Sequence, residues 1–230
     1  MRWADLDVLN HVNNVTYLEY AAEAQGLLVA DGAVRPDRAV DVTVTFLAPL
    51  LLSLAPVTVV STFDADVLTQ EIRSGDDASV VNARVVSTWR QVPPLTVPDG
   101  AEGPIPVRVR VGDVDATGAV TLPKIFELFQ ESRVLLIADH LPRRTVGQFV
   151  VGTVAVQTFG ELHWRVEPYL AHGWLSRVGN GSFTIESVVS DGERHLLRAT
   201  SVLVGFDVET QRSRAFTEEE RAVMAAAVLA

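Results

Sequence analysis

The stretch RWADLDVLNHVNNVTYLEY, residues 2–20, decides the fold, because it leads from a D-x-D pair through a loop into a helix. Asn13 or Asn14 can cap that helix, since a side-chain amide oxygen accepts hydrogen bonds from the free N–H groups of a first turn. Apolar residues then recur at helical spacing and predict a stripe on one face. They are Val15, Leu18, Ala21, Ala22 and Leu28.

The same pattern recurs near the middle of the chain. Arg2–Gln25 aligns without a gap with Arg110–Arg133, and six of the 24 aligned positions are identical, including both aspartates of D-x-D. This agreement predicts a duplication. Thr121 can cap the second helix, and Pro123 is tolerated in a first turn. The apolar stripe of the second helix is stronger: Leu122, Ile125, Phe126, Phe129 and Leu136.

After each helix the apolar period changes to two, as in half-buried antiparallel strands. One helix followed by about four strands, twice over, predicts an α+β fold in which each half packs a long central helix on a curved antiparallel sheet. A final helix is expected where Thr217 and Glu220 have capping-box spacing. The alternating runs are Val40, Val42, Val44 and Phe46; Val81, Ala83, Val85, Ser87 and Trp89; Phe183, Ile185, Ser187 and Val189; and Leu197, Ala199, Ser201 and Leu203.

A proline-rich segment separates the two copies. Five of the eleven prolines fall between Pro93 and Pro106, which is typical of a semi-rigid, extended linker. We therefore expect an N-terminal domain over residues 1–91, a linker over 92–106 and a C-terminal domain over 107–230. Pairing the two sheets edge to edge would cover the strand edge that each half exposes by itself.

Composition excludes several classes of site. The chain has no cysteine, and its five histidines lack paired metal-ligand spacing, so we expect neither a metal nor another cofactor. The N-terminus has no apolar segment of the kind found in secretory signals. The longest apolar run, Phe46–Val60, is too short and too often interrupted to span a bilayer. Cytoplasmic location without membrane association is the expectation.

The charge also limits the partners. A formal net charge of −10 repels phosphate backbones, which argues against nucleic acid. An anionic ligand such as coenzyme A would need a local arginine cluster, because arginine matches phosphate geometry bidentately.

The pattern D-x-x-x-H-V-N-N-x-x-Y, running from Asp7 through His11 to Tyr17, resembles hotdog-fold thioesterases of the 4-hydroxybenzoyl-coenzyme A thioesterase type. It is also similar to the acyl-carrier-protein thioesterases. Together with Arg177–Phe183 and the C-terminal segment, the resemblance covers nearly all of the chain outside the linker. It implies a tandem, or double, hotdog whose two halves mimic the usual dimer, with association of such chains into homo-oligomers as a further expectation.

The resemblance implies specific roles. Asp7 would be the catalytic carboxylate, the backbone N–H near Asn14 would form the oxyanion hole, and His11 would orient Asp7 or the substrate. Acyl-carrier-protein thioesterases often use an asparagine two residues after the aspartate; Leu9 stands there in this chain and favours coenzyme A thioesters. The implied substrate-binding residues are Asn13, Val15, Gly179, Asn180, Gly181 and Ser182.

The chemistry is reasonable on physical grounds as well. A helix N-terminus supplies free N–H groups and a positive dipole end for a developing oxyanion. One such donor contributes roughly 10²–10³ in rate, and a positioned carboxylate acting as a base adds about 10²–10⁴. Whether Asp7 attacks the carbonyl or deprotonates water stays open at this level.

Each of these residues also has a structural interpretation. An aspartate ahead of a helix is commonly a cap or a turn residue, His11 can fix the loop, and Asn13 and Asn14 can serve as caps. Glycine within Gly179–Ser182 can mark a bulge or a tight strand crossing.

The two halves differ in complementary ways. The first has His-Val-Asn-Asn, but Asp64–Val67 stands where the second has Gly179–Ser182; the second has Ala119–Leu122 in place of His-Val-Asn-Asn. If each site is built from both halves, the sequence predicts one working site, with Asp7 facing Gly179–Ser182, and one degenerate site at Asp115.

The expected function is therefore hydrolysis of acyl-coenzyme A thioesters to the free acid and coenzyme A. Two alternatives stay open: a non-catalytic hotdog protein that binds or senses acyl-coenzyme A, and an acyl-carrier-protein thioesterase. A fold by itself does not decide between them.

Overall fold

The computed structural model describes residues 5–7, 11–34, 37–75, 77–90, 96–140 and 149–229. The chain forms two compact units. The first half comprises Met1–Val92 with Leu122–Lys124, and the second half comprises Pro93–Thr121 with Ile125–Ala230.

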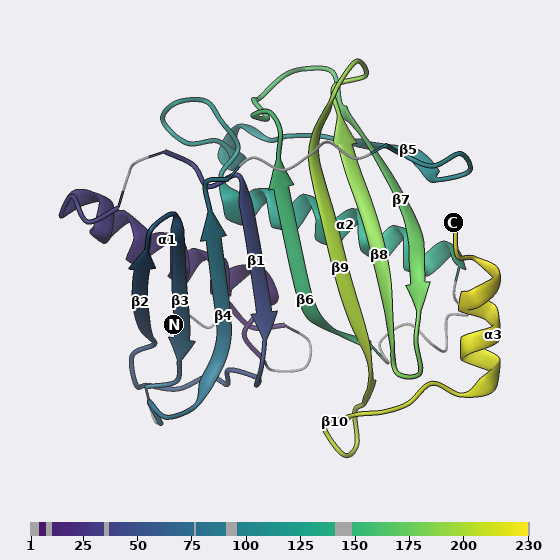
Figure 1. Cartoon of the computed structure of the whole chain (residues 1–230), viewed down its shortest axis with the longest axis horizontal. Helices are drawn as coiled ribbons and strands as arrows, with labels where there is room; N and C mark the ends of the chain where they lie inside the picture. The colour runs from purple at the N-terminus through teal and green to yellow at the C-terminus, as the bar shows by residue number, and fades with distance from the viewer. Residues whose placement is uncertain are drawn as a thin grey trace. The chain divides into compact units, whose positions relative to one another are not determined.

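The first half is one helix on a four-stranded antiparallel sheet with the strand order β2-β3-β4-β1. Helix α1 lies across one face of this sheet (Figure 1). The inward positions of the strands alternate as expected, with Val42, Val44, Ala83, Val85 and Ser87 buried. The elements are α1 (Asn14–Ala30), β1 (Asp41–Phe46), β2 (Thr58–Asp64), β3 (Val67–Arg73) and β4 (Val81–Thr88).

Helix α1 begins where the sequence predicts. Asn13 is its cap, and its side-chain oxygen accepts the N–H of Val15 at 3.0 Å. The buried face differs from the expected stripe, because Ala22 is exposed whereas Thr16 and Tyr17 are buried together with Leu18 and Ala21. Tyr17 can occupy the interior because its hydroxyl finds a backbone partner there, as buried tyrosines require.

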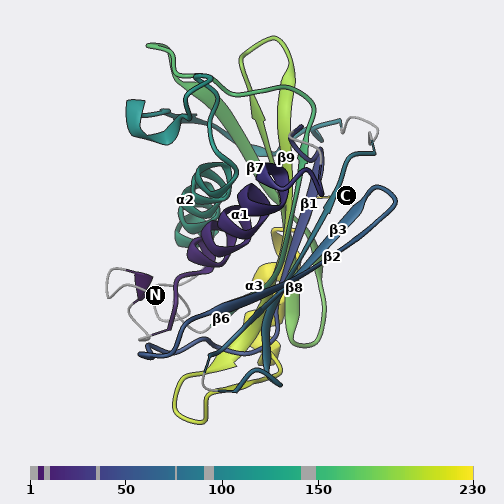
Figure 2. The same ribbon diagram turned by 90° about the vertical axis from the view of Figure 1, so that its left-hand side faces the viewer.

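The second half has the same order of elements with additions at both ends. Its antiparallel sheet has the order β6-β9-β8-β7-β5, and β10 pairs with β9. Helix α2 lies against one face of this sheet (Figure 2). The elements are β5 (Glu102–Val107), the 3-10 turn η2 (Val111–Asp113), α2 (Leu122–His140), β6 (Phe149–Thr158), β7 (Tyr169–Val178), β8 (Ser182–Ser190), β9 (His195–Asp207), β10 (Arg212–Ser213) and α3 (Glu218–Ala226).

The core of the second half lies between α2 and the sheet. All eight residues of the two expected alternating runs, on β8 and β9, are buried. Phe149 and Phe183 meet edge to face, with ring centroids 5.1 Å apart. Helix α3 is held at the edge by β7, since the N–H of Leu229 donates to the carbonyl of Leu175 at 2.9 Å. The predicted capping box is present, with Thr217 and Glu220 each accepting the other's backbone N–H.

The last part of the proline-rich segment is a strand. Its last residues form β5, which pairs antiparallel with β7 and has a register shift between Glu102 and Ile105. A proline has no N–H for a ladder, so a strand containing Pro104 and Pro106 is tolerated at a sheet edge, where β5 lies. Residues 91–95 lie outside the described residues. The domain boundaries at 91 and 107 stay predictions.

No helix within the described residues is long and apolar enough to cross a membrane.

Candidate active site

The loop that carries Asp7 is closed by reciprocal hydrogen bonds. The N–H of Asp7 donates to the carbonyl of His11 at 2.8 Å, and the N–H of His11 donates to Oδ1 of Asp7 at 3.1 Å. Leu6 and Val12 form an isolated antiparallel bridge across the same loop. The half-buried Asp7 carboxylate is therefore held by backbone groups at the entrance to α1.

A buried tyrosine lies beneath this loop. The N–H of Val12 donates to the carbonyl of Leu50 at 2.8 Å, and the N–H of Leu50 donates to the hydroxyl of Tyr17 at 2.9 Å. Burial raises the pKa of Tyr17 to about 12, with a smaller contribution from the negative charge of Asp7. Tyr17 thus stays a neutral phenol at physiological pH, in the electrostatic neighbourhood of Asp7.

The first turn of α1 has one N–H that no described residue accepts. The N–H of Val15 is taken by the Asn13 side chain, and the N–H of Thr16 donates to the Asn13 carbonyl at 3.0 Å. Among the residues that the structure describes, none accepts the N–H of Asn14. A free amide at a helix N-terminus is suited to an anionic oxygen.

The structure therefore brings five of the predicted site residues into one loop and helix start of the first half: Asp7, His11, Asn13, Asn14 and Val15. In this arrangement Asn13 acts as a cap, and Val15 contributes an N–H that is already bonded. Tyr17 and Leu50 had no assigned role in the sequence, although Tyr17 belongs to the quoted motif. Leu50 carried no local signal, because its contact with Tyr17 spans 33 residues.

Gly179–Ser182 is a hairpin turn of the second half, joining β7 to β8. The N–H of Gly179 donates to the carbonyl of Ser182 at 2.7 Å, which closes the turn. Two of its carbonyls accept further bonds, that of Asn180 from the N–H of Phe216 at 2.8 Å and that of Gly181 from the N–H of Gly205 on β9 at 2.9 Å. Another backbone segment passes close to this hairpin turn, since a Cβ on Gly181 would stand 3.0 Å from the carbonyl oxygen of Arg214. The role of the turn toward a substrate stays a prediction.

The loop around Asp115 repeats the hydrogen bonds of the Asp7 loop. The N–H of Asp115 donates to the carbonyl of Ala119 at 2.9 Å, and the N–H of Ala119 approaches Oδ1 of Asp115 at 3.4 Å. The same Oδ1 also accepts the N–H and the hydroxyl of Thr117, at 2.8 and 2.5 Å. In the first half, Leu9 aligns with Thr117, and a leucine side chain has no hydrogen-bonding group.

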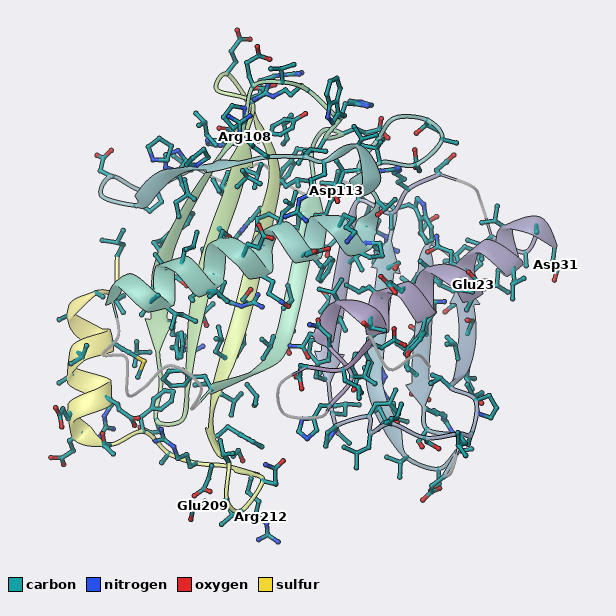
Figure 3. The ribbon with its side chains drawn as sticks, turned by 180° about the vertical axis from the view of Figure 1, so that it is seen from behind. Glu23, Asp31, Arg108, Asp113, Glu209 and Arg212 are labelled. Carbon is teal, nitrogen blue, oxygen red and sulfur yellow. The ribbon has the colours of Figure 1, made fainter. Side chains whose placement is uncertain are left out.

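The start of α2 also differs from that of α1. Pro123 aligns with Val15 and has no N–H to offer. Asp113, which aligns with Asp5, is buried and accepts the N–H of Arg110 at 2.7 Å (Figure 3). The second loop is therefore fastened by its own side chains.

Within the described part of the chain, no cluster of histidine, aspartate and glutamate has the geometry to hold a metal ion.

Comparisons with known proteins identify the fold. A family model described as the acyl-ACP thioesterase C-terminal domain matches residues 1–36. No curated protein matches the chain by sequence. Among solved structures, one from Lactobacillus plantarum, assigned as an oleoyl thioesterase, has a TM-score of 0.65 at 14% identity and covers 90% of this chain and 94% of its own.

Two further structures span most of both chains. The 12:0-ACP thioesterase from Umbellularia californica has a TM-score of 0.61 at 9% identity and covers 93% of this chain and 92% of its own. An acyl-ACP thioesterase from Bacteroides thetaiotaomicron has a TM-score of 0.56 at 11% identity and covers 88% of this chain and 94% of its own. The chain thus has an α+β fold that matches hotdog-fold thioesterases, and the likeness establishes the fold alone.

Proposed function

We propose that this chain hydrolyses acyl thioesters at a site in its first half, built from the Asp7 carboxylate and the N-terminal amide of α1. The observation that carries the proposal is the loop closed between Asp7 and His11, which leads to the N–H of Asn14, a donor that no described residue accepts. The Asp7 carboxylate and the N–H of Asn14 thereby lie seven positions apart in the chain, with backbone hydrogen bonds joining residues 7 and 11.

The two groups have complementary roles. Asp7 either attacks the thioester carbon, giving an anhydride that water hydrolyses, or removes a proton from an attacking water. In both cases negative charge develops on the former carbonyl oxygen, and the N–H of Asn14 with the positive end of α1 stabilises it. The thiolate then leaves and is protonated.

The buried surroundings strengthen these interactions. Tyr17 is fully covered and neutral, so the floor beneath Asp7 is weakly polarisable, and electrostatic interactions there are stronger than in water. This supports a preorganised site rather than a solvated turn.

The second half supports a single working site. Oδ1 of Asp115 is engaged by both the N–H and the hydroxyl of Thr117, and Ala119 and Leu122 stand where the first half has His11 and Asn14. We propose that Asp115 is a loop residue, that the second site is degenerate, and that the Gly179–Ser182 turn contributes to substrate binding.

Two carriers remain candidates. Leu9, in place of the asparagine common in acyl-carrier-protein thioesterases, favours coenzyme A thioesters, and the substrate we expected was acyl-coenzyme A. The match of residues 1–36 to an acyl-ACP thioesterase family favours the carrier protein instead. Both carriers present the same thioester to the same site.

Thiol release decides the proposal. Wild-type protein would be assayed with acyl and aroyl thioesters of coenzyme A and of acyl carrier protein carrying identical chains, so that the ratio of turnover identifies the carrier. Asp7→Asn should lower kcat by about 10²–10⁴. The matched control Asp115→Asn should keep turnover within a few-fold.

Two outcomes would overturn the proposal. Equal losses in Asp7→Asn and Asp115→Asn would remove the assignment of a single site. Saturable binding of an acyl thioester without any thiol release would identify a binding or sensing protein instead.

A further inference from the structure

The outermost strand of the first half has one edge without a partner. β2 is the last strand of its sheet (Figure 1), and it pairs with β3 in regular register from Thr58 to Asp64. Among the described residues, no backbone group pairs with the other edge of β2. A bare strand edge presents a row of N–H and C=O groups on which a further strand can pair.

The corresponding edge of the second half is closed. β7 has the position of β2, because α2, β6, β7, β8 and β9 repeat the order of α1 and the four strands that follow it. β5 pairs antiparallel with Tyr169–Gly173 of β7. Beyond that stretch, Leu175 forms a parallel bridge with Val228 and accepts the N–H of Leu229 at 2.9 Å. Within the described part of the first half, neither β5 nor the segment after α3 has a counterpart.

The two helices show the same difference. Continuing the ungapped alignment along them sets Leu28–Val29 of α1 against Leu136–Ile137 of α2. Leu136 and Ile137 are buried in a core that includes Met224 of α3, whereas Leu28 and Val29 are only half-buried. Figure 3 shows that α1 projects past β2 toward its end at Asp31. A strand added to β2 would therefore extend the sheet toward the last turn of α1.

The sequence of β2 lacks the features that block strand pairing. Edge strands are commonly protected by prolines, charged side chains or bulges, as β5 is by Pro104 and Pro106. Thr58–Phe63 contains neither a proline nor a charged residue, and its register with β3 has no bulge. Val60 and Phe63 are 43% and 40% exposed. This edge is therefore regular, apolar and open to pairing.

We propose that β2 pairs with β2 of a second copy of this chain, antiparallel about a two-fold axis at Ser61. In such a dimer both copies use the same surface, so the strand that offers an edge also fills one. Full overlap sets Val59 opposite the partner's Phe63, on the face of the sheet that α1 covers. Cross-strand pairs of aromatic and β-branched side chains are favourable. The association uses none of the residues proposed for hydrolysis.

The charges of the chain are compatible with this pairing. Asp64 is the one charged residue of β2, and full overlap sets it opposite the partner's Thr58, so that the two copies of Asp64 stand at opposite ends of the paired strands. At longer range, two chains with a formal net charge of −10 repel each other, and salt screens that repulsion. Self-association should therefore strengthen as ionic strength rises, whereas an association through surface ion pairs would weaken.

Sedimentation equilibrium of the full chain measures this self-association against protein and salt concentration. The double variant Val60→Lys/Thr62→Lys sets lysine directly opposite lysine across the axis, and it should weaken dimer formation by at least about tenfold. Mixing it with Val60→Glu/Thr62→Glu should restore a dimer, because each lysine then faces a glutamate. Val208→Lys is the matched control, since Val208 is 46% exposed in the turn between β9 and β10.

Single cysteines report the register, because the chain has no cysteine of its own. Directly opposed residues of antiparallel strands have Cα atoms about 4.5–5.5 Å apart, a separation that a disulfide bridges. Ser61→Cys should therefore give a cross-linked dimer with oxidised glutathione. Thr58→Cys and Asp64→Cys should each fail to cross-link alone, and an equimolar mixture of the two should cross-link.

Three outcomes would overturn the proposal. Wild-type protein that sediments as a monomer at every protein and salt concentration would exclude a second copy as the occupant of this edge. A dimer that persists in Val60→Lys/Thr62→Lys, or one in which Ser61→Cys does not cross-link, would place the contact on another surface. Thermal melts of each variant separate loss of pairing from loss of folding, and the cross-links decide the matter even if the lysine variant is unfolded. None of these measurements depends on thiol release.

Discussion

The N–H of His11 donates to Oδ1 of Asp7 at 3.1 Å, while the N–H of Asp7 donates to the carbonyl of His11 at 2.8 Å. Both bonds use the backbone of residue 11. The imidazole therefore is not what holds the Asp7 loop in shape, and the loop-fixing role expected of His11 belongs to its backbone.

His11→Ala keeps both backbone bonds, so we expect it to lower kcat/KM for thiol release by no more than about tenfold, well below the loss expected for Asp7→Asn. Steady-state kinetics on the two variants provide the measurement. A loss in His11→Ala as large as that in Asp7→Asn would assign the imidazole to the chemistry itself.

Tyr17→Phe removes the acceptor of a buried N–H, that of Leu50. A buried donor left without a partner costs about 1–3 kcal/mol, so the free energy of unfolding in urea should fall by that amount. Tyr20→Phe is the control, because the Tyr20 hydroxyl donates to Asp5 at 3.0 Å in a half-buried position. We expect a smaller loss there; equal losses would contradict the buried bond.

Replacing each of two glycines by alanine should change the stability of the protein in opposite directions. A Cβ on Gly205 would stand 2.7 Å from the carbonyl oxygen of Arg214, and Gly205→Ala should destabilise the protein by about 1–3 kcal/mol. Gly26 lies inside α1 with nothing within 4 Å, so Gly26→Ala should stabilise by about 0.5–1 kcal/mol. Melting temperatures measure both, and a shift of the same sign in the two variants would contradict the packing.

Glu220 should make stability depend on acid pH. Hydrogen bonds from Arg214, and then from the N–H of Thr217, hold the pKa of Glu220 below its ordinary value. The unfolded chain therefore binds this proton more readily, and the contribution, present in full above about pH 4.5, is lost as pH falls through the folded pKa.

Urea unfolding between pH 7 and 3 tests that sign. Glu220→Gln should cost about 1 kcal/mol at pH 7, and its difference from wild type should shrink toward pH 3. Glu219→Gln, at an exposed position of the same turn, should show neither effect. A difference that grows in acid would refute the assignment.

The local structure could be predicted from the sequence. Asn13 caps α1, Thr217 and Glu220 form their capping box, and the alternating runs of β8 and β9 are buried as expected. These features depend on neighbours within a few positions, where side-chain periodicity and the free N–H groups of a first turn decide the outcome. The D-x-D loop and the start of α1 belong to the same class.

Tertiary structure decided what depends on residues far apart in the chain. The bond between Tyr17 and Leu50, the pairing of β5 with β7, and the burial of Arg133 against Ser201 join positions between 33 and 71 residues apart. Local patterning carries no information on such partners, because each contact forms only when the strands pair and the helix settles on the sheet. The motif therefore located the candidate catalytic loop, while the buried contacts of Tyr17 and of Arg133 emerged only from the folded chain.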